Sequence, residues 1–250
     1  MINLARDFHF ADFTTTAYRA LLRRAGETWT FRGYDDAATN ERFLIWRHDV
    51  DCSMHRAHAL ARIEADAGVK ATYFVLLHSE MYNLLEQSIS RLVREIAAMG
   101  HTIGLHLDTG YHDVRHEDEL PDVIAWEAAI LERVSGQPVT AFSFHNPTAR
   151  ELAWQRDHYA GRHNAYAARF QSTVGYVSDS NGYWRHRRLA EVLDQAADHQ
   201  LQVLTHPEWW TDEMLSPAAR IERCIRGRAD ATRHSYQTLL QQGGRLNVGA

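Results

Sequence analysis

The chain has 250 residues, of which 45% are hydrophobic and 24% charged, an ordinary composition for a soluble globular protein. Its net charge of −5 disfavours a nucleic-acid partner, because phosphate binding usually requires a basic surplus. No repeat, low-complexity tract or Pro/Gly-rich linker divides it, so we expect a single α/β domain over residues 1–250.

The cellular compartment is predicted from what the sequence lacks. Cys52 and Cys224 are too few for a disulfide framework, and Met1–Asp7 has neither the basic region nor the apolar run of a signal peptide. No stretch approaches the ~20 apolar residues of a transmembrane helix. We therefore expect a cytoplasmic protein without stable membrane insertion, and nothing in the sequence points to a particular oligomeric state.

Short apolar segments alternate with longer amphipathic ones along the chain, which is typical of consecutive βα units. The apolar segments suit strands that are buried on both faces, and the predicted strands are 43–48, 71–76, 102–107, 139–144, 174–178 and 202–205. The predicted helices are 15–25, 53–67, 87–99, 120–135, 187–199 and 217–242. Three of them end at a glycine, as helices often do. The pattern predicts a βα barrel, with no element assigned in 150–172.

Histidines gather at the ends of the predicted strands. In a parallel βα fold the carboxyl ends of the strands share one face, where active sites lie. Four of the six predicted strands run into a histidine or stop on one, namely His48, His106, His145 and His206. This placement favours a functional site at that face.

The first predicted strand also carries two aspartates. Alternation in an extended chain places Asp49 and Asp51 on the same side, where they would repel each other unless a cation or a shared proton intervenes. Asp51 or Ser53 could instead cap the following helix. Because His106 should face the same end of the barrel, and imidazole and carboxylate are natural ligands of zinc and similar ions, we expect a metal site.

Six segments resemble the ordered motifs of the polysaccharide deacetylases, the NodB-homology carbohydrate esterases. They are Arg47-His48-Asp49-Val50-Asp51, Ala71-Thr72-Tyr73-Phe74-Val75-Leu76, Gly100-His101-Thr102-Ile103-Gly104-Leu105-His106, Phe144-His145-Asn146-Pro147, Ser178-Asp179-Ser180-Asn181-Gly182-Tyr183-Trp184 and Leu204-Thr205-His206. The resemblance runs from about Leu44 to Trp210. It is strongest to a divergent branch with the Arg-His-Asp-Val-Asp opening, often associated with surface-polysaccharide synthesis.

The resemblance implies a distorted, TIM-like (β/α)7 barrel that holds one divalent metal ion, usually zinc. By position, it implies that the general base is Asp49, that Asp51 and His106 bind metal, and that His206 protonates the leaving amine. It further implies orienting or substrate-binding roles, which we assign to Arg47, His145, Asp179 and Trp184.

One departure from the family pattern concerns the third metal ligand. The usual motif has a second histidine four residues after His106, where this chain has Gly110. The nearest substitute is His112, although a regular helix would not bring it to the same point. His145 is the alternative, and on the sequence alone we favour His112.

The expected function is a metal-dependent N-deacetylase that acts on a carbohydrate, either an N-acylated sugar or a surface-polysaccharide precursor. One alternative is an amidohydrolase that acts on a small cyclic or linear amide. The other is a catalytically inactive sugar-binding homologue, which the missing histidine favours and the retention of Asp49, Asp51, His106 and His206 disfavours.

Overall fold

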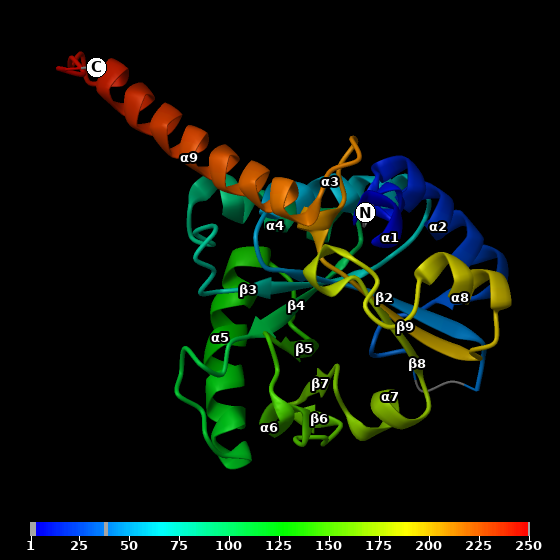
Figure 1. Ribbon diagram of the computed structural model, residues 1–250. Helices are drawn as coiled ribbons and strands as arrows, with labels where there is room; N and C mark the ends of the chain where they lie inside the picture. The colour runs from blue at the N-terminus through cyan, green and yellow to red at the C-terminus, as the bar shows by residue number, and fades with distance from the viewer. Residues whose placement is uncertain (1–3, 38–39, 250) are drawn as a thin grey trace.

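The structure is a computed structural model that describes residues 4–37 and 40–249, so the first three residues of the N-terminal segment discussed above lie outside it. At its centre lies one curled sheet (Figure 1). Seven strands pair in parallel, in the order β7 (Arg162–Asn164), β5 (Ala141–Phe144), β4 (Thr102–Leu107), β3 (Thr72–Leu76), β2 (Phe43–Val50), β9 (Gln200–Thr205) and β8 (Gly175–Ser178).

The sheet is a half-barrel. The short strand β6 (His158–Tyr159) runs antiparallel to β7 at one edge, and β1 (Thr30–Phe31) pairs with β2. Within the described ranges no ladder joins β8 to β6 or β7. The expected α/β barrel of seven parallel strands is confirmed, and its distortion is this open side.

The helices surround the sheet. They are α1 (Leu4–Asp7), α2 (Thr15–Thr28), α3 (Met54–Asp66), α4 (Gln87–Ala98), α5 (Leu120–Ser135), α6 (Ala149–Leu152), α7 (Ala168–Ser172), α8 (Leu189–Gln195) and α9 (Pro217–Gln242). In Figure 1, α9 runs away from the body of the molecule towards the C-terminus. The predicted helix 187–199 is shorter than expected, because Ala196 adopts a left-handed conformation with φ of 48° and ends it.

Local packing explains several of these elements. Every residue of β2 is buried, as expected for a strand covered on both faces. In α4 the buried residues Ile89, Leu92, Val93 and Ile96 recur at helical spacing and form one apolar stripe. Gly136 ends α5 with a φ of 73°, a left-handed conformation that glycine adopts without steric cost.

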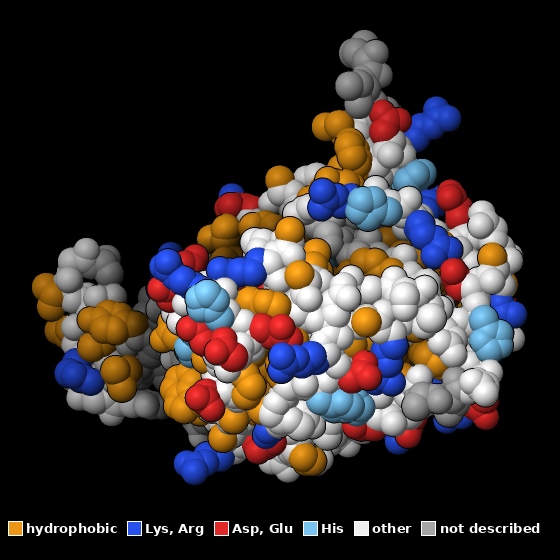
Figure 2. Space-filling view, turned by 90° about the horizontal axis from the view of Figure 1, so that it is seen from below, with side chains coloured by type: hydrophobic (Ala, Val, Ile, Leu, Met, Phe, Trp, Pro, Cys, Tyr) orange, Lys and Arg blue, Asp and Glu red, His pale blue; other side chains and the backbone are white. Residues whose placement is uncertain are grey.

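This fold brings His106, His145 and His206 to one edge of the sheet, whereas the side chain of His48 is buried against Glu64 of α3. Strands β2, β4, β5 and β9 are parallel, so the residues at their carboxyl ends lie side by side. On the face shown in Figure 2, acidic and basic side chains of the described residues are interspersed. No helix within the described residues is long and apolar enough to cross a membrane.

Candidate functional site

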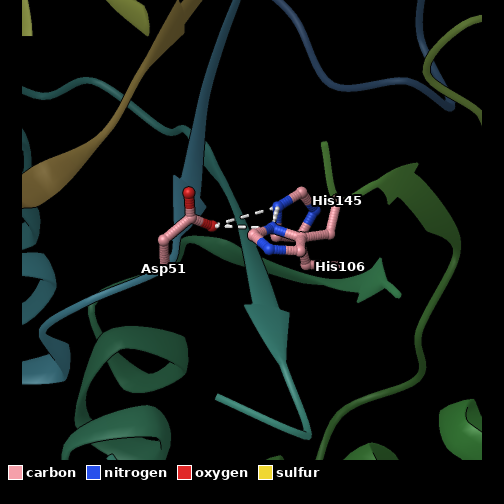
Figure 3. A group of neighbouring side chains, drawn as sticks. All are labelled: Asp51, His106 and His145. Atoms are coloured by element: carbon pink, nitrogen blue, oxygen red, sulfur yellow. Dashed lines mark hydrogen bonds and ion pairs between the residues drawn. The ribbon is translucent and has the colours of Figure 1, made fainter. Parts of the chain in front are cut away.

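Three side chains from the ends of β2, β4 and β5 point toward one another (Figure 3). Asp51 follows β2, His106 lies in β4, and His145 follows β5. His106 Nε2 lies 3.1 Å from Asp51 Oδ1, His145 Nδ1 lies 3.4 Å from the same oxygen, and the two nitrogens are 3.2 Å apart. The three atoms therefore form a nearly equilateral triangle.

The triangle has the dimensions of a metal site. Ligand atoms about 2.0–2.1 Å from a tetrahedral zinc ion are separated by about 3.3–3.4 Å, close to the three distances observed. Asp51 Oδ1 is buried and accepts no well-directed hydrogen bond from the described residues. A cation between the three atoms would satisfy this oxygen, so the residues fit a divalent metal ion.

The tautomer of His106 supports the same assignment. Ser143 Oγ donates to Asp49 Oδ1 at 3.3 Å and lies 2.7 Å from His106 Nδ1. Because its proton goes to Asp49, the serine oxygen accepts from Nδ1–H. The lone pair of His106 then lies on Nε2, the atom that faces Asp51 and His145.

Electrostatics keep Asp51 ionised. Burial works to raise the pKa of Asp51, but the neighbouring imidazoles of His106 and His145 outweigh it and hold the pKa well below its usual range. For His145, burial works to lower the pKa, and the interaction with Asp51 raises it above its ordinary value. Metal binding at this nitrogen therefore has to displace a proton.

Asp49 lies beside the triangle and is held by a buried arginine. Arg47 is fully buried and donates from Nη2 to Asp49 Oδ2 at 2.8 Å and to the Tyr166 hydroxyl at 3.2 Å. Asp49 Oδ2 lies 3.8 Å from His106 Nε2. Asp49 is thus fixed beside the three atoms of the triangle and lines the same cavity.

His206 follows β9, the strand that pairs with β2 on its other side, and is held by Asp179. The two carboxylate oxygens of Asp179 accept from the His206 backbone N–H, from Trp210 Nε1 at 3.0 Å and from His206 Nδ1 at 2.7 Å. His206 Nε2 is left facing Asp51 Oδ2 at 4.0 Å. Burial works to lower the pKa of His206, but Asp179 outweighs it and raises the pKa to about 10.

A cavity of about 570 Å³ lies against this group, and several of the residues described above line it. Its lining includes Asp49, Asp51, His106 and His206. The other walls are mostly polar or aromatic and include Tyr166, Tyr176, Asn181, Arg185 and Gln202. The volume is typical of small-molecule sites, and the site is open to a ligand larger than water.

His112 lies elsewhere. Its Nε2 lies 2.5 Å from Glu127 Oε1 on α5, and its potential ligand atoms group with His78 and Glu127 rather than with Asp51. The sequence-based preference for His112 over His145 does not agree with this geometry. The physical reason is a turn at Asp108, whose side chain accepts the N–H of Gly110 and leads the chain away from the cavity.

Trp184 does not line the cavity, contrary to expectation. Its indole N–H donates to Asp12 at 3.0 Å, and its ring stacks on Phe13 with the ring centroids 5.1 Å apart. The other tryptophans near strand ends, Trp46, Trp209 and Trp210, are buried in the core. The aromatic walls of the cavity are formed by two tyrosines and two phenylalanines instead, Tyr166, Tyr176, Phe144 and Phe170.

Two contributors to the site were not singled out in the sequence. Ser143 pairs with His106 in the β4–β5 register, and the available signal was a serine inside an otherwise apolar strand. Tyr166 follows β7, in the stretch to which no element could be assigned. Neither residue carries a recognisable motif.

Comparison with known proteins identifies similar folds. No family model and no curated protein sequence matches the chain. Solved structures with a related fold include a family 4 carbohydrate esterase from Bacillus anthracis, at 15% identity and a TM-score of 0.45, with 86% of each chain covered. A peptidoglycan N-acetylglucosamine deacetylase has 17% identity and a TM-score of 0.46, with coverage of 83% of this chain and 90% of that one.

A family 4 pseudoenzyme from Bacillus anthracis is also similar, at 15% identity and a TM-score of 0.42. There the similarity covers 77% of this chain and 62% of the pseudoenzyme, so this chain spans less than two thirds of its length. At these identities the similarity concerns the fold, and we infer no activity from it.

Proposed function

We propose that the protein is a metal-dependent N-deacetylase that removes an acyl group from the nitrogen of a sugar. The observation that carries this proposal is the Asp51–His106–His145 triangle, with a carboxylate on one side and an imidazole on the other. Amide hydrolysis needs these parts, because the carbonyl is a poor electrophile and the amine a poor leaving group.

Asp51, His106 and His145 would hold the ion, for which zinc is our proposal because its usual ligands are imidazole and carboxylate. A bound divalent ion would polarise the acyl carbonyl and lower the pKa of the attacking water to about 7. His145 thus takes the position that the sequence had assigned to His112.

Asp49 is the proposed general base. Its carboxylate lies next to the triangle, within one water molecule of His106 Nε2. Arg47 and Ser143 each donate a hydrogen bond to it, which fixes its orientation. Asp49 would accept the proton of the water as that water attacks the carbonyl carbon.

His206 is the proposed general acid. Asp179 binds Nδ1–H, so the second ring proton lies on Nε2, the nitrogen that faces the cavity. The raised pKa of His206 keeps that proton in place at neutral pH. His206 would deliver it to the departing nitrogen, which prevents the tetrahedral intermediate from returning to the amide.

The cavity supports a sugar as the substrate. Its polar side chains, including Asn181 and Gln202, can exchange hydrogen bonds with hydroxyl groups, and Tyr166 and Tyr176 can offer apolar ring surface to a sugar face. The position of His145 also weakens the case for an inactive homologue. That case rested on the histidine missing at Gly110, and a second imidazole is present beside His106 without it.

The test is release of acetate from N-acetylglucosamine oligomers by the purified protein, with zinc added or with zinc removed by a chelator. We expect turnover that depends on zinc and is abolished in Asp51→Asn. Asp230→Asn, an exposed aspartate on α9, is the matched control and should behave like wild type. Hydrolysis of small cyclic or linear amides but not of N-acetyl sugars would favour the amidohydrolase alternative, and zinc-independent turnover would contradict the proposed mechanism.

A further inference from the structure

A second group of potential metal ligands lies outside the cavity. His78 follows β3, His112 follows β4, and Glu127 lies on α5. Glu127 Oε1 is 2.9 Å from His78 Nε2 and 2.5 Å from His112 Nε2. The three ligand atoms lie within 4.8 Å of one another, and none of these residues lines the proposed catalytic cavity.

The carboxylate at the centre of this group is incompletely satisfied. Glu127 is fully buried, and its second oxygen, Oε2, has no hydrogen-bond partner among the described residues. A buried carboxylate with an unpaired oxygen is costly, and bound cations commonly relieve that cost. The side chains of His78 and His112 are 18% and 16% exposed, so an ion can reach the group from solvent.

Aromatic rings enclose the group. The Tyr111 ring stacks on His78 with a centroid separation of 3.4 Å and an interplanar angle of 9°. The Trp126 ring lies parallel to the His78 imidazole, with the ring centroids 6.4 Å apart, and it packs edge-on against His112. These contacts fix the two imidazole planes with Nε2 of each ring turned toward the carboxylate.

The turn after β4 explains why His112 belongs here. Asp108 accepts the backbone N–H groups of Gly110 and Tyr111, and Asp113 has a φ of 51°, which closes the turn. His112 is thereby carried to α5 instead of into the cavity. His112, which the sequence spacing suggested as a displaced catalytic ligand, thus lies with His78 and Glu127 instead.

We propose that His78, His112 and Glu127 form a second divalent-metal site, separate from the catalytic centre. Two imidazoles and a carboxylate are a ligand set that zinc uses, with the remaining position left for water. The ion would connect the loops after β3 and β4 to α5. Since it would bind the folded chain, its expected effect is stabilisation of these loops. The proposal does not rest on the proposed deacetylase activity.

The experiment measures zinc bound per chain by elemental analysis after equilibration with zinc and desalting. We expect two equivalents for wild type, one for His78→Ala, one for His145→Ala and none for the double variant. His199→Ala, an exposed histidine in the loop after α8, is the matched control and should retain two.

The two sites can be distinguished by which variant loses an equivalent of bound zinc. If wild type binds one ion that is lost in His78→Ala and kept in His145→Ala, the second site is supported while the catalytic metal is contradicted. If His78→Ala binds as much zinc as wild type, the second site is overturned, and the His–Glu contacts are hydrogen bonds only.

A second measurement guards against unfolding of a variant. Because Glu127 is buried, the tested residue is the partly exposed His78, and its variants can be compared by melting temperature. In the His145→Ala background, zinc at 100 times its Kd should raise Tm by roughly 5–10 °C. The rise should vanish when His78→Ala is added, and an equal rise in both proteins would overturn the proposal.

Discussion

The two proposed proton-transfer residues, Asp49 and His206, are each held by a buried partner. Asp179 is fully buried, and its oxygens accept from the backbone and side chain of His206 and from Trp210. Arg47 holds Asp49 in a similar way. Each proposed proton-transfer group therefore has a fixed direction, and Asp179 also raises the pKa of His206.

Asp179→Asn should change the pH profile in a defined direction. Asp179 raises the pKa of His206, and a histidine is active as an acid only below its pKa. Removing the negative charge lowers that pKa, so the basic limb of kcat/KM should move to lower pH while the acidic limb stays. The profile is measured by deacetylation across the pH range. An unmoved basic limb would mean that His206 is not the acid.

Variants of the proposed proton-transfer residues should lose activity without losing the metal ion. Asp49→Asn and His206→Ala should keep the catalytic ion and each lose turnover on the order of 10²-fold or more. The double variant should lose less than the product of the two effects, because the residues act as one unit. Zinc content and kcat are measured on the same samples. Loss of the ion from His206→Ala would make that residue a ligand.

At the scale of elements, β4 depends on a close approach to β3. A Cβ atom at Gly104 would lie 2.4 Å from the ring of Phe74, which is itself buried beneath the Arg47 guanidinium. Gly104→Ala should therefore destabilise the fold by about 1–3 kcal/mol and disturb the Arg47–Asp49 pair. Its activity should fall as well.

Urea unfolding and deacetylation rates test this expectation. The matched control is Gly227→Ala in α9, where a Cβ would meet nothing within 4 Å. That substitution should leave activity unchanged and stabilise the fold by up to about 1 kcal/mol, because alanine is the better helix former. Equal stability of the two variants would show that Phe74 can move aside.

Long periodic elements could be predicted from the sequence, and short ones could not. Strand β4 and helix α5 have the bounds expected from their apolar patterns. Strands β6 and β7 have two and three residues, and the polar sequence Arg162-His163-Asn164 offers no alternation to detect. Their pairing depends on β5, which is a tertiary contact.

For the site too, regular elements could be predicted from the sequence and loop conformations could not. The proximity of strand-end residues such as Asp51, His106 and His145 could be predicted, because the carboxyl ends of parallel strands lie at one edge of the sheet. His112 could not be positioned, because its direction depends on the turn at Asp108–Asp113 and on a glutamate 15 residues further along. A loop conformation of this kind carries no periodic signal.

At the scale of the whole molecule, the proposed catalytic ion would join three strands of the open sheet. Asp51, His106 and His145 come from the ends of β2, β4 and β5. The ion would therefore connect residues that are far apart in the sequence, from position 51 to position 145. The buried core is large without it, and we expect the metal-free protein to keep its fold. The ion should then add stability without being required for folding.

This stabilisation should disappear in acid. His145 has a raised pKa without the ion, so protons compete for its Nδ1 from a higher pH than for an ordinary histidine. The increase in Tm caused by zinc, measured in the His78→Ala background to isolate the catalytic centre, should be large at pH 8 and shrink steadily toward pH 5. Far-UV circular dichroism of the metal-free protein should stay the same over that range. A zinc-induced increase that is constant from pH 8 to pH 5 would exclude His145 as a ligand, because an imidazole cannot bind the ion and the proton through the same nitrogen.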